Sequence, residues 1–203
     1  KIRNFELHNK HKLDITSKNT NKYEIDILEK LLINLIIPYR YDCIIDLYPI
    51  FTILNTIDIV EYIVKLKEGI IYDYFKKNNI LFLNNINNNE RRYYNYQSNE
   101  YETYIEKKYD NRENLFIIYS QRDIVGIDFK QPIGMIGAII CNEKLRYTDV
   151  SQAIFRLRKL NKGHYFDYIF IDNLPNIQNK DNIDKFDLEN NTDLFKIFIL
   201  NDE

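Results

Sequence analysis

Apolar residues recur at helical spacing in two segments near the start of the chain. The first segment predicts a helix that ends at Pro38, because proline lacks an N–H group and its ring clashes with the preceding turn. The apolar positions of this helix are Ile25, Leu28, Leu32 and Leu35. The second segment, residues 57–64, predicts a helix that Asn55 or Thr56 can cap and that Gly69 is placed to end.

Five short runs are continuously apolar, which is typical of strands that are covered on both faces of a sheet. They are DCIIDLY (42–48), ILFL (80–83), LFIIY (115–119), IGAII (136–140) and YFDYIFI (165–171). Because helical segments alternate with these runs, we expect an α/β fold with a mostly parallel sheet of about five to six strands, flanked by helices. The polar segment at about 84–114 predicts an insertion that is partly helical or disordered.

The same pattern divides the chain into three parts. Residues 1–38 are expected to form a connector, polar as far as residue 21, and the first helix. Residues 39–172 are expected to form one domain built on the sheet, since 203 residues suffice for one fairly large core. Residues 173–203 form an acidic extension, whose segment DLFKIFIL either adds a last helix to the sheet or docks on a neighbouring domain.

The composition is that of a soluble globular protein, with 45% hydrophobic and 29% charged residues and no apolar run long enough to cross a membrane. The two cysteines cannot form a disulfide framework, so we expect a reducing, intracellular compartment, cytoplasmic or nuclear. The chain does not begin with Met, and we expect a processed product or a segment of a longer protein. The net charge of -2 gives no general attraction to nucleic acid, so anion binding requires a local basic cluster.

One such cluster is the stretch SQAIFRLRKLNKGH, residues 151–164. The spacing predicts a helix that Thr148 or Asp149 can cap, with Gly163 in the left-handed position after its end. The apolar stripe of this helix consists of Val150, Ala153, Ile154, Leu157 and Leu160.

The polar face of the same predicted helix presents an amide and two cations in register. Gln152, Arg156 and Lys159 share this face, and Arg158 lies on its flank. Such a face is either a solvated surface or an anion site, most naturally for phosphate.

A second motif, YSQRDIVGIDFKQP, spans residues 119–132 and begins at the end of an apolar run. It places Gly126 and Asp128 in a loop at the carboxyl end of a predicted strand, where open α/β sheets bind their ligands. Taken alone, the Gly-Ile-Asp tripeptide is also typical of a tight turn that the Asp side chain caps. The order of strand, loop, strand and basic helix is more informative than the tripeptide.

In this order, the two motifs resemble motifs V and VI of the second RecA-like lobe of superfamily 2 helicases. GIDFKQP followed by DVSQAIFRLRKLNKGH is also similar to a helicase-like domain family of unknown function, found in very large eukaryotic proteins sometimes labelled ubiquitinase-like. The stretch CIIDLYPIFTILNTIDIVEYI resembles that family's Ile-Asp strand and the helix after it. The resemblance covers about residues 40 to 172, apart from the insertion.

This resemblance implies a RecA-like lobe of the P-loop NTPase type that lacks its own P-loop. The chain contains no G-x-x-x-x-G-K-[ST] loop and no acidic box for a metal. ATP and Mg²⁺ are therefore expected to be bound mainly by a first RecA-like lobe, the partner implied by the family. The chain is then a fragment of an ATP hydrolase that is not active alone, and nucleic acid or a ubiquitin-related protein is a further expected partner.

The resemblance also assigns roles to individual residues. Arg156 matches the helicase arginine that contacts nucleotide phosphate, and Gln152 matches the residue that orients the helix. Gly126 and Asp128 match the motif V loop, which links the nucleotide to the nucleic-acid track.

Two positions depart from the family pattern. Lys159 stands where helicases have their finger arginine, with Arg158 one position before it, and lysine cannot supply the planar bidentate fork of arginine. Asp123 stands where the narrower family has His, and an acidic residue near phosphate is unfavourable. The alternative is therefore a degenerate lobe that acts as a non-catalytic scaffold or protein-interaction module in a large protein.

Three other chemistries are weaker candidates. Cys43 with one of the three histidines is the pattern of a thiol hydrolase, but its apolar run favours a core cysteine. His8 and His11 have no further ligand at metal spacing, so no metal site is expected. RRYYNYQ, residues 91–97, combines arginine and aromatic residues as single-stranded nucleic acid requires, or else reflects compositional drift in a loop.

Overall fold

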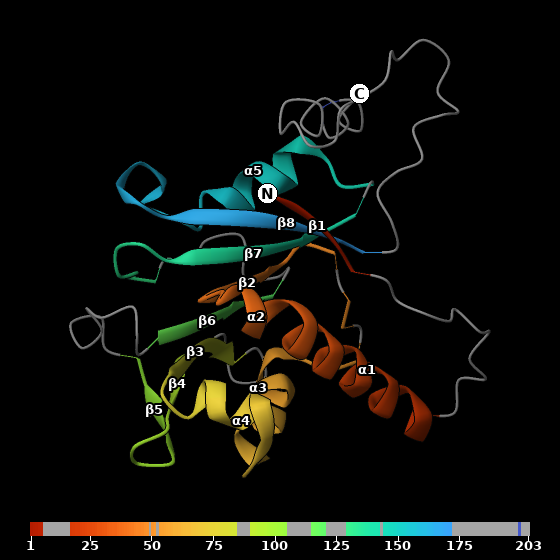
Figure 1. Ribbon diagram of the computed structural model, residues 1–203, viewed down its shortest axis with the longest axis vertical. Coiled ribbons are helices and arrows are strands. Elements are labelled where there is room, and N and C mark those ends of the chain that lie inside the picture. Colours follow the sequence, from red (N-terminus) through yellow and green to blue (C-terminus); the bar gives the residue numbers. More distant parts are fainter. Residues whose placement is uncertain are drawn as a thin grey trace.

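The sheet is the centre of the molecule, and helices lie on both of its faces (Figure 1). The computed structural model describes residues 1–5, 17–48, 50–51, 53–84, 90–104, 115–120, 129–142, 144–171 and 199. Within these ranges, eight strands form one sheet in the order β1-β8-β7-β2-β6-β3-β4-β5. None of the helices in these ranges is both long and apolar enough to cross a bilayer.

All five apolar runs form strands, as predicted, and they make the parallel centre of the sheet. These strands are β2 (Cys43–Asp46), β3 (Asn79–Asn84), β6 (Leu115–Tyr119), β7 (Ile136–Cys141) and β8 (Tyr165–Ile171). β2 lies in the middle and pairs in parallel with β6 on one side and β7 on the other. The predicted α/β class with a mostly parallel sheet is therefore confirmed.

The sheet is wider than predicted, because three further strands extend it. β1 (Ile2–Phe5) pairs in parallel with β8, although the beginning of the chain was expected to be a connector. β4 (Glu90–Asn95) and β5 (Glu100–Thr103) continue the other side in antiparallel pairing. The prediction of a helical or disordered insertion is thus wrong for residues 90–104, which add strands whose tyrosine rings supply the buried surface.

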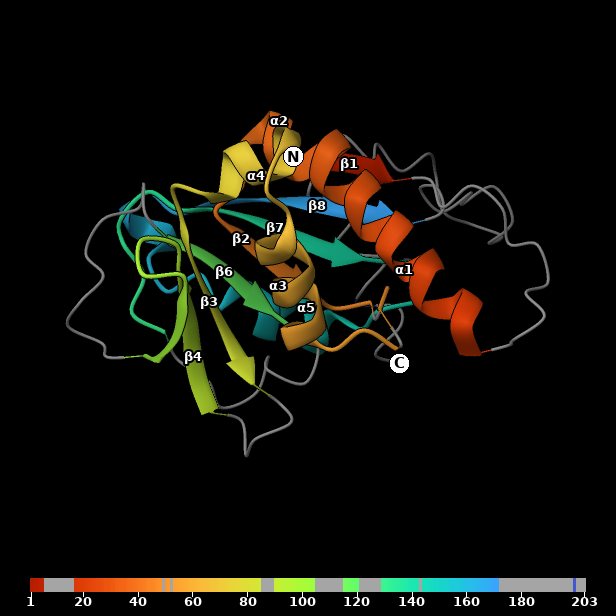
Figure 2. The same cartoon turned by 90° about the horizontal axis from the view of Figure 1, so that it is seen from below.

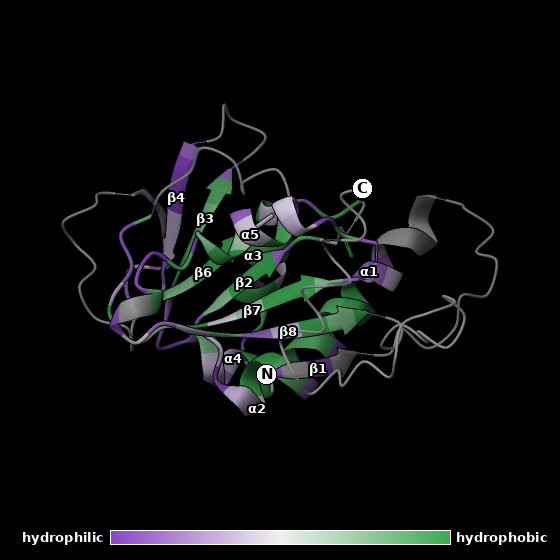
Figure 3. Ribbon diagram, turned by 90° about the horizontal axis from the view of Figure 1, so that it is seen from above, coloured by the Kyte–Doolittle hydropathy of each residue, from purple (hydrophilic) through white to green (hydrophobic). Residues whose placement is uncertain are grey.

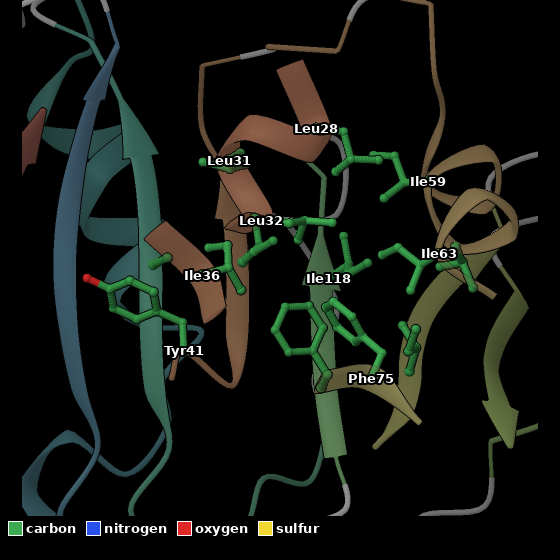
Figure 4. Packing of buried hydrophobic residues seen from close by; sticks show 14 of the residues in the cluster. Leu28, Leu31, Leu32, Ile36, Tyr41, Ile59, Ile63, Phe75 and Ile118 are labelled. Atoms are coloured by element: carbon green, nitrogen blue, oxygen red, sulfur yellow. The ribbon is translucent and has the colours of Figure 1, made fainter. Parts of the chain in front are cut away.

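Four helical segments cover one face of the sheet, seen from below in Figure 2. They are α1 (Ser17–Leu31), which continues through a π-helical turn (Leu32–Ile36) into α2 (Ile37–Tyr39), then α3 (Thr56–Lys65) and α4 (Gly69–Phe75). Leu28 of α1 and Ile59 of α3 lie next to each other on this face, and Phe75 packs edge-on against Phe116 of β6 (Figure 4).

The helix boundaries agree with the sequence in part. Asn55 caps α3 as predicted, and its side chain and that of Asp58 form a reciprocal capping box. The first helix does not end at Pro38 but continues to Tyr39, since proline is tolerated in the first turn of α2 after the π-helical turn. Gly69 does not end α3; it begins α4 with a φ of 92°, a left-handed conformation that glycine adopts without strain.

The opposite face carries α5 (Tyr147–Ile154) and the segment 129–135, and is seen from above in Figure 3. The hydropathy colouring there shows apolar central strands and a polar β4. Val150, Ala153 and Leu157 are fully buried against this face, which confirms that part of the predicted apolar stripe.

Arg3 joins β1 to the rest of the sheet through side-chain contacts. Its Nε donates to the hydroxyl of Tyr41 at 2.8 Å and to Asp167 of β8 at 2.9 Å. The Tyr41 hydroxyl donates to the same carboxylate oxygen at 2.6 Å. Residues 3 and 167, which are far apart in sequence, are therefore joined by one hydrogen-bonded cluster at the β1–β8 side of the sheet.

Gly137 of β7 permits the close approach of Leu157. A Cβ atom at position 137 would lie 2.9 Å from Leu157 Cδ1, which is closer than van der Waals contact. Because Gly137 has no side chain, the segment after α5 can pack closely on β7 at this position.

We expect Gly137→Ala to lower the free energy of unfolding by about 1 to 3 kcal/mol, because overpacking displaces Leu157. Urea unfolding of the wild type, the two single variants and Gly137→Ala/Leu157→Ala measures the coupling. In the Leu157→Ala background the added methyl group should cost clearly less. Equal costs in both backgrounds would show that the contact with Leu157 is not the cause.

Candidate functional site

The basic residues predicted to lie on one helix lie mostly in a loop. α5 ends at Ile154, and residues 155–163 form turns and the short 3-10 helix Leu160–Lys162. We call residues 155–163 the basic loop. The predicted helical register of Gln152, Arg156 and Lys159 is therefore wrong, since only Gln152 remains on the helix.

The boundaries of α5 also differ from the prediction at its start. Arg146, not Thr148 or Asp149, occupies the N-cap position, and its side chain makes an ion pair with Asp149 at 3.2 Å. At the other end, Gly163 has the predicted left-handed conformation, with a φ of 93°, but it follows the loop instead of the helix.

Gln131 explains why the helix stops early. Its Nε2 donates to the carbonyl of Arg156 at 2.7 Å, and its Oε1 accepts from the N–H of Arg158 at 3.3 Å. A continued helix would need these two backbone groups for its own hydrogen bonds. The side chain of Gln131 therefore replaces helical hydrogen bonds and fixes an irregular backbone.

The same carboxamide joins the two sequence motifs. Gln131 is only 2% exposed, and its Nε2 also donates to the hydroxyl of Tyr119, the last residue of β6, at 2.9 Å. Tyr119 and Gln131 belong to the segment 119–132, whereas Arg156 and Arg158 belong to the basic loop. The structure thus brings the end of the first motif into direct contact with the second.

Lys159 is held by two further contacts on this face. Its Nζ donates to the carbonyl of Gln131 at 2.7 Å, and its backbone N–H donates to Nδ1 of His164 at 3.3 Å. Because Nδ1 of His164 accepts, the ring carries its proton on Nε2, which donates to the carbonyl of Pro132 at 2.8 Å. The ammonium group of Lys159 therefore contacts a backbone carbonyl within the chain.

The predicted site residues fall into three groups. Gln152 and Arg158 are exposed, and Arg156 and Lys159 are half-buried. The structure brings Arg156, Arg158 and Lys159 together around Gln131. Gly126 and Asp128, like Asp123, lie outside the described residues, so their contribution to the site stays a prediction.

The basic loop leads to the amino ends of two neighbouring strands. The N–H of Tyr165, where β8 begins, donates to the carbonyl of Met135, directly before β7, at 3.0 Å. In Figure 1 the basic loop and the turn before β7 project together at the left of the view. Open α/β sheets bind ligands at the carboxyl ends of their strands, so the Arg158 and Lys159 region lies away from that edge.

The carboxyl edge holds polar residues that the sequence did not single out. Asp46 ends β2 and Asn84 ends β3, and both side chains are buried. Burial raises the pKa of Asp46 well above its ordinary range, and the nearby Glu24 adds to this effect. A carboxylate inside a continuously apolar run was the available signal for Asp46, and an amide directly before the apolar residues 132–137 was the signal for Gln131.

The cysteines are core residues. Cys43 and Cys141 are both fully buried and unpaired with each other, and burial raises the pKa of each thiol. Both ring nitrogens of His164 make the hydrogen bonds to Lys159 and Pro132 described above. His8 and His11 lie outside the described residues. Among the residues that the structure describes, no three His, Cys, Asp or Glu side chains are grouped to hold a metal ion.

The tyrosines of RRYYNYQ do not form an exposed stacking surface. Tyr93 and Tyr94 are 1% and 5% exposed. Tyr94 packs against Tyr96 and Tyr101 with ring centroids at 4.9 and 5.1 Å. These rings are part of the packing of β4 and β5, so they are not available to bases.

Comparisons with known protein families, with curated proteins and with solved structures find no match for this chain.

We expect Gln131→Met to lower the free energy of unfolding by about 2 kcal/mol, because it removes the buried hydrogen bonds that the Gln131 side chain makes with the Tyr119 hydroxyl, the Arg156 carbonyl and the Arg158 N–H. Guanidinium unfolding measures the change. The same substitution at the exposed Gln97 is the matched control and should change the stability by less than about 0.5 kcal/mol. Equal effects at both positions would contradict the role assigned to Gln131.

We expect both thiols to be unreactive in the folded protein. The raised pKa lowers the thiolate fraction at pH 8 below that of a free cysteine, and burial blocks the reagent. Labelling with a chromogenic disulfide at pH 8 should release less than about a tenth of one equivalent without denaturant, and two equivalents in guanidinium. Rapid native labelling of Cys43 would instead favour a reactive thiol.

Proposed function

We propose that this chain is the C-terminal, RecA-like lobe of a helicase-like ATPase. The hydrogen bonds of Gln131 carry the proposal, because they join the end of the Gly-Ile-Asp motif to the basic loop on one face of a parallel sheet. The order and the residues of these two motifs resemble motifs V and VI of superfamily 2 helicases. A fixed basic loop next to such a motif is suited to binding phosphate.

In this proposal, Arg156, Arg158 and Lys159 stabilise the negative charge that develops on the transferred phosphoryl group. Gln152 is exposed on α5 and contributes to nucleotide binding, together with Gly126 and Asp128. A first RecA-like lobe outside this chain supplies the phosphate-binding loop and holds ATP and Mg²⁺. The chain alone is therefore not expected to hydrolyse ATP.

The second candidate is a degenerate lobe that serves as a scaffold or protein-interaction module in a large, ubiquitin-related protein. The contact between Lys159 Nζ and the Gln131 carbonyl favours this candidate. A finger residue must reach across a cleft, whereas this ammonium group is used to fix the loop. An intracellular location, cytoplasmic or nuclear, is part of the proposal in either case, and the further partner is nucleic acid or a ubiquitin-related protein.

In the complete protein that includes the first lobe, we expect Arg156→Ala and Arg158→Ala to reduce ATP turnover, together on the order of 10³-fold or more. The reason is the loss of cations that stabilise the transition state. Lys159→Arg should preserve or raise turnover, because arginine restores the bidentate fork. Steady-state ATP hydrolysis with and without RNA or DNA measures each effect.

Lys65→Ala is the matched control, since Lys65 lies on α3, on the other face of the sheet, and is 73% exposed. Its turnover should equal that of the wild type. Thermal unfolding checks that the Arg156→Ala protein is folded, because Arg156 is half-buried. Unchanged turnover in folded arginine variants, or no turnover in the wild type, would overturn the ATPase and leave the scaffold.

A further inference from the structure

Two buried polar oxygens on the face covered by α1 and α3 have no hydrogen-bond partner. They are Oδ1 of Asp46, the last residue of β2, and Oγ1 of Thr56, the first residue of α3. Asp46 is 8% exposed and Thr56 is 2% exposed. An unpaired buried oxygen costs free energy comparable to a lost hydrogen bond. Two such oxygens, one at each end of the connection from β2 to α3, therefore suggest that a ligand binds between these elements.

The side chains of Asp46 and Thr56 point into the same layer. Asp46 lies two positions after Ile44, whose side chain belongs to the apolar cluster under α1 and α3, so Asp46 faces that layer. Thr56 lies three and four positions before Ile59 and Val60, which pack into the same cluster. Asp46 therefore faces the helices, and Thr56 faces the sheet.

Glu24 of α1 adds a second carboxylate. It is 4% exposed, and it lies one turn before Leu28, which meets Ile59 in Figure 4. Its carboxylate accepts the backbone N–H groups of Ile53 and Leu54, directly before α3. Glu24 is close enough to Asp46 for its charge to raise the pKa of that carboxyl group.

These three residues come from α1, from β2 and from α3, at the carboxyl edge of the central strand. The chain connections on the two sides of β2 run in opposite directions at this edge. The chain leaves β2 toward β3 on one side, and it leaves β7 toward β8 on the other side. Such a switch point is where open α/β sheets place their ligands. The donors are two carboxylates and one hydroxyl group, and this set suits a hard cation with oxygen ligands.

We propose that Asp46, Thr56 and Glu24 bind a divalent cation of the magnesium, manganese or calcium type at the carboxyl edge of β2. A bound cation offsets the repulsion between the two buried carboxylates and gives both unpaired oxygens a partner. Two carboxylates and a hydroxyl group do not fill the coordination sphere of such an ion, so water completes it. The site is on the face opposite the basic loop and does not depend on the ATPase proposal.

The experiment uses the whole chain, first treated with EDTA and then titrated with MgCl2, MnCl2 or CaCl2. Calorimetry measures binding, and thermal unfolding measures stabilisation. For at least one of these ions we expect saturable binding of one equivalent and a rise in Tm with concentration. Binding of Mn²⁺ can also be followed by its loss of free-ion EPR signal.

Two variants separate ligation from folding. Asp46→Asn keeps the size of the side chain and removes one of the two buried carboxyl groups, so without metal it should be as stable as the wild type, or more stable. It should nevertheless lose the metal-dependent rise in Tm. Thr56→Val keeps the shape of the side chain and removes the oxygen, and it should weaken binding about tenfold.

Asp73→Asn is the control, because Asp73 is an exposed carboxylate that pairs with Lys76 on α4. Its metal affinity should equal that of the wild type. A Tm that does not respond to any of the three ions would overturn the proposal and leave water as the occupant. Equal metal effects in the wild type and in folded Asp46→Asn would also overturn it, by assigning the binding to other surface carboxylates.

Discussion

One buried carboxamide determines how the second layer of this protein is built. Gln131 takes backbone groups that α5 would need in order to continue, and it anchors them to Tyr119 in the middle of the sheet. The basic residues after α5 are consequently displayed on an irregular backbone, with Leu157 pressed against Gly137 below them. A polar group fully satisfied inside an apolar layer specifies one arrangement, because every alternative leaves it unpaired.

The two faces of the sheet are each covered by a buried apolar cluster, but different elements supply the cover. On one face, α1, the π-helical turn, α3 and α4 bury apolar side chains against the sheet, so ordinary side-chain packing suffices there. On the other face the described helices are α5 and the short 3-10 helix Leu160–Lys162, and the irregular segment 129–135 and aromatic rings complete the cover. Tyr104 and Tyr119 both pack on Phe129, at centroid distances of 5.5 and 5.4 Å. The face with fewer helices is the one that carries the polar junction.

The sequence predicted features that depend on neighbouring residues. The five apolar runs, the cap at Asn55 and the buried stripe through Val150 and Leu157 follow from local periodicity. The early end of α5 could not be predicted, since it depends on Gln131, 25 residues away in sequence from Arg156. β4 was missed because its sequence, ERRYYN, is mostly charged or polar, and the burial of its two adjacent tyrosines depends on pairing with β3. For the basic loop, the residue types were predicted but their helical register was not.

The pairing of β1 with β8 has a consequence for the order of assembly. Arg3 and Asp167 are 164 residues apart in sequence, yet they meet in one hydrogen-bonded cluster. During synthesis, β1 leaves the ribosome long before β8 exists, so it cannot take its place until nearly the whole domain has been made. Closing so long a loop costs conformational entropy that must be met before the β1–β8 contacts form. The β1 edge is therefore expected to be the last part of the sheet to form.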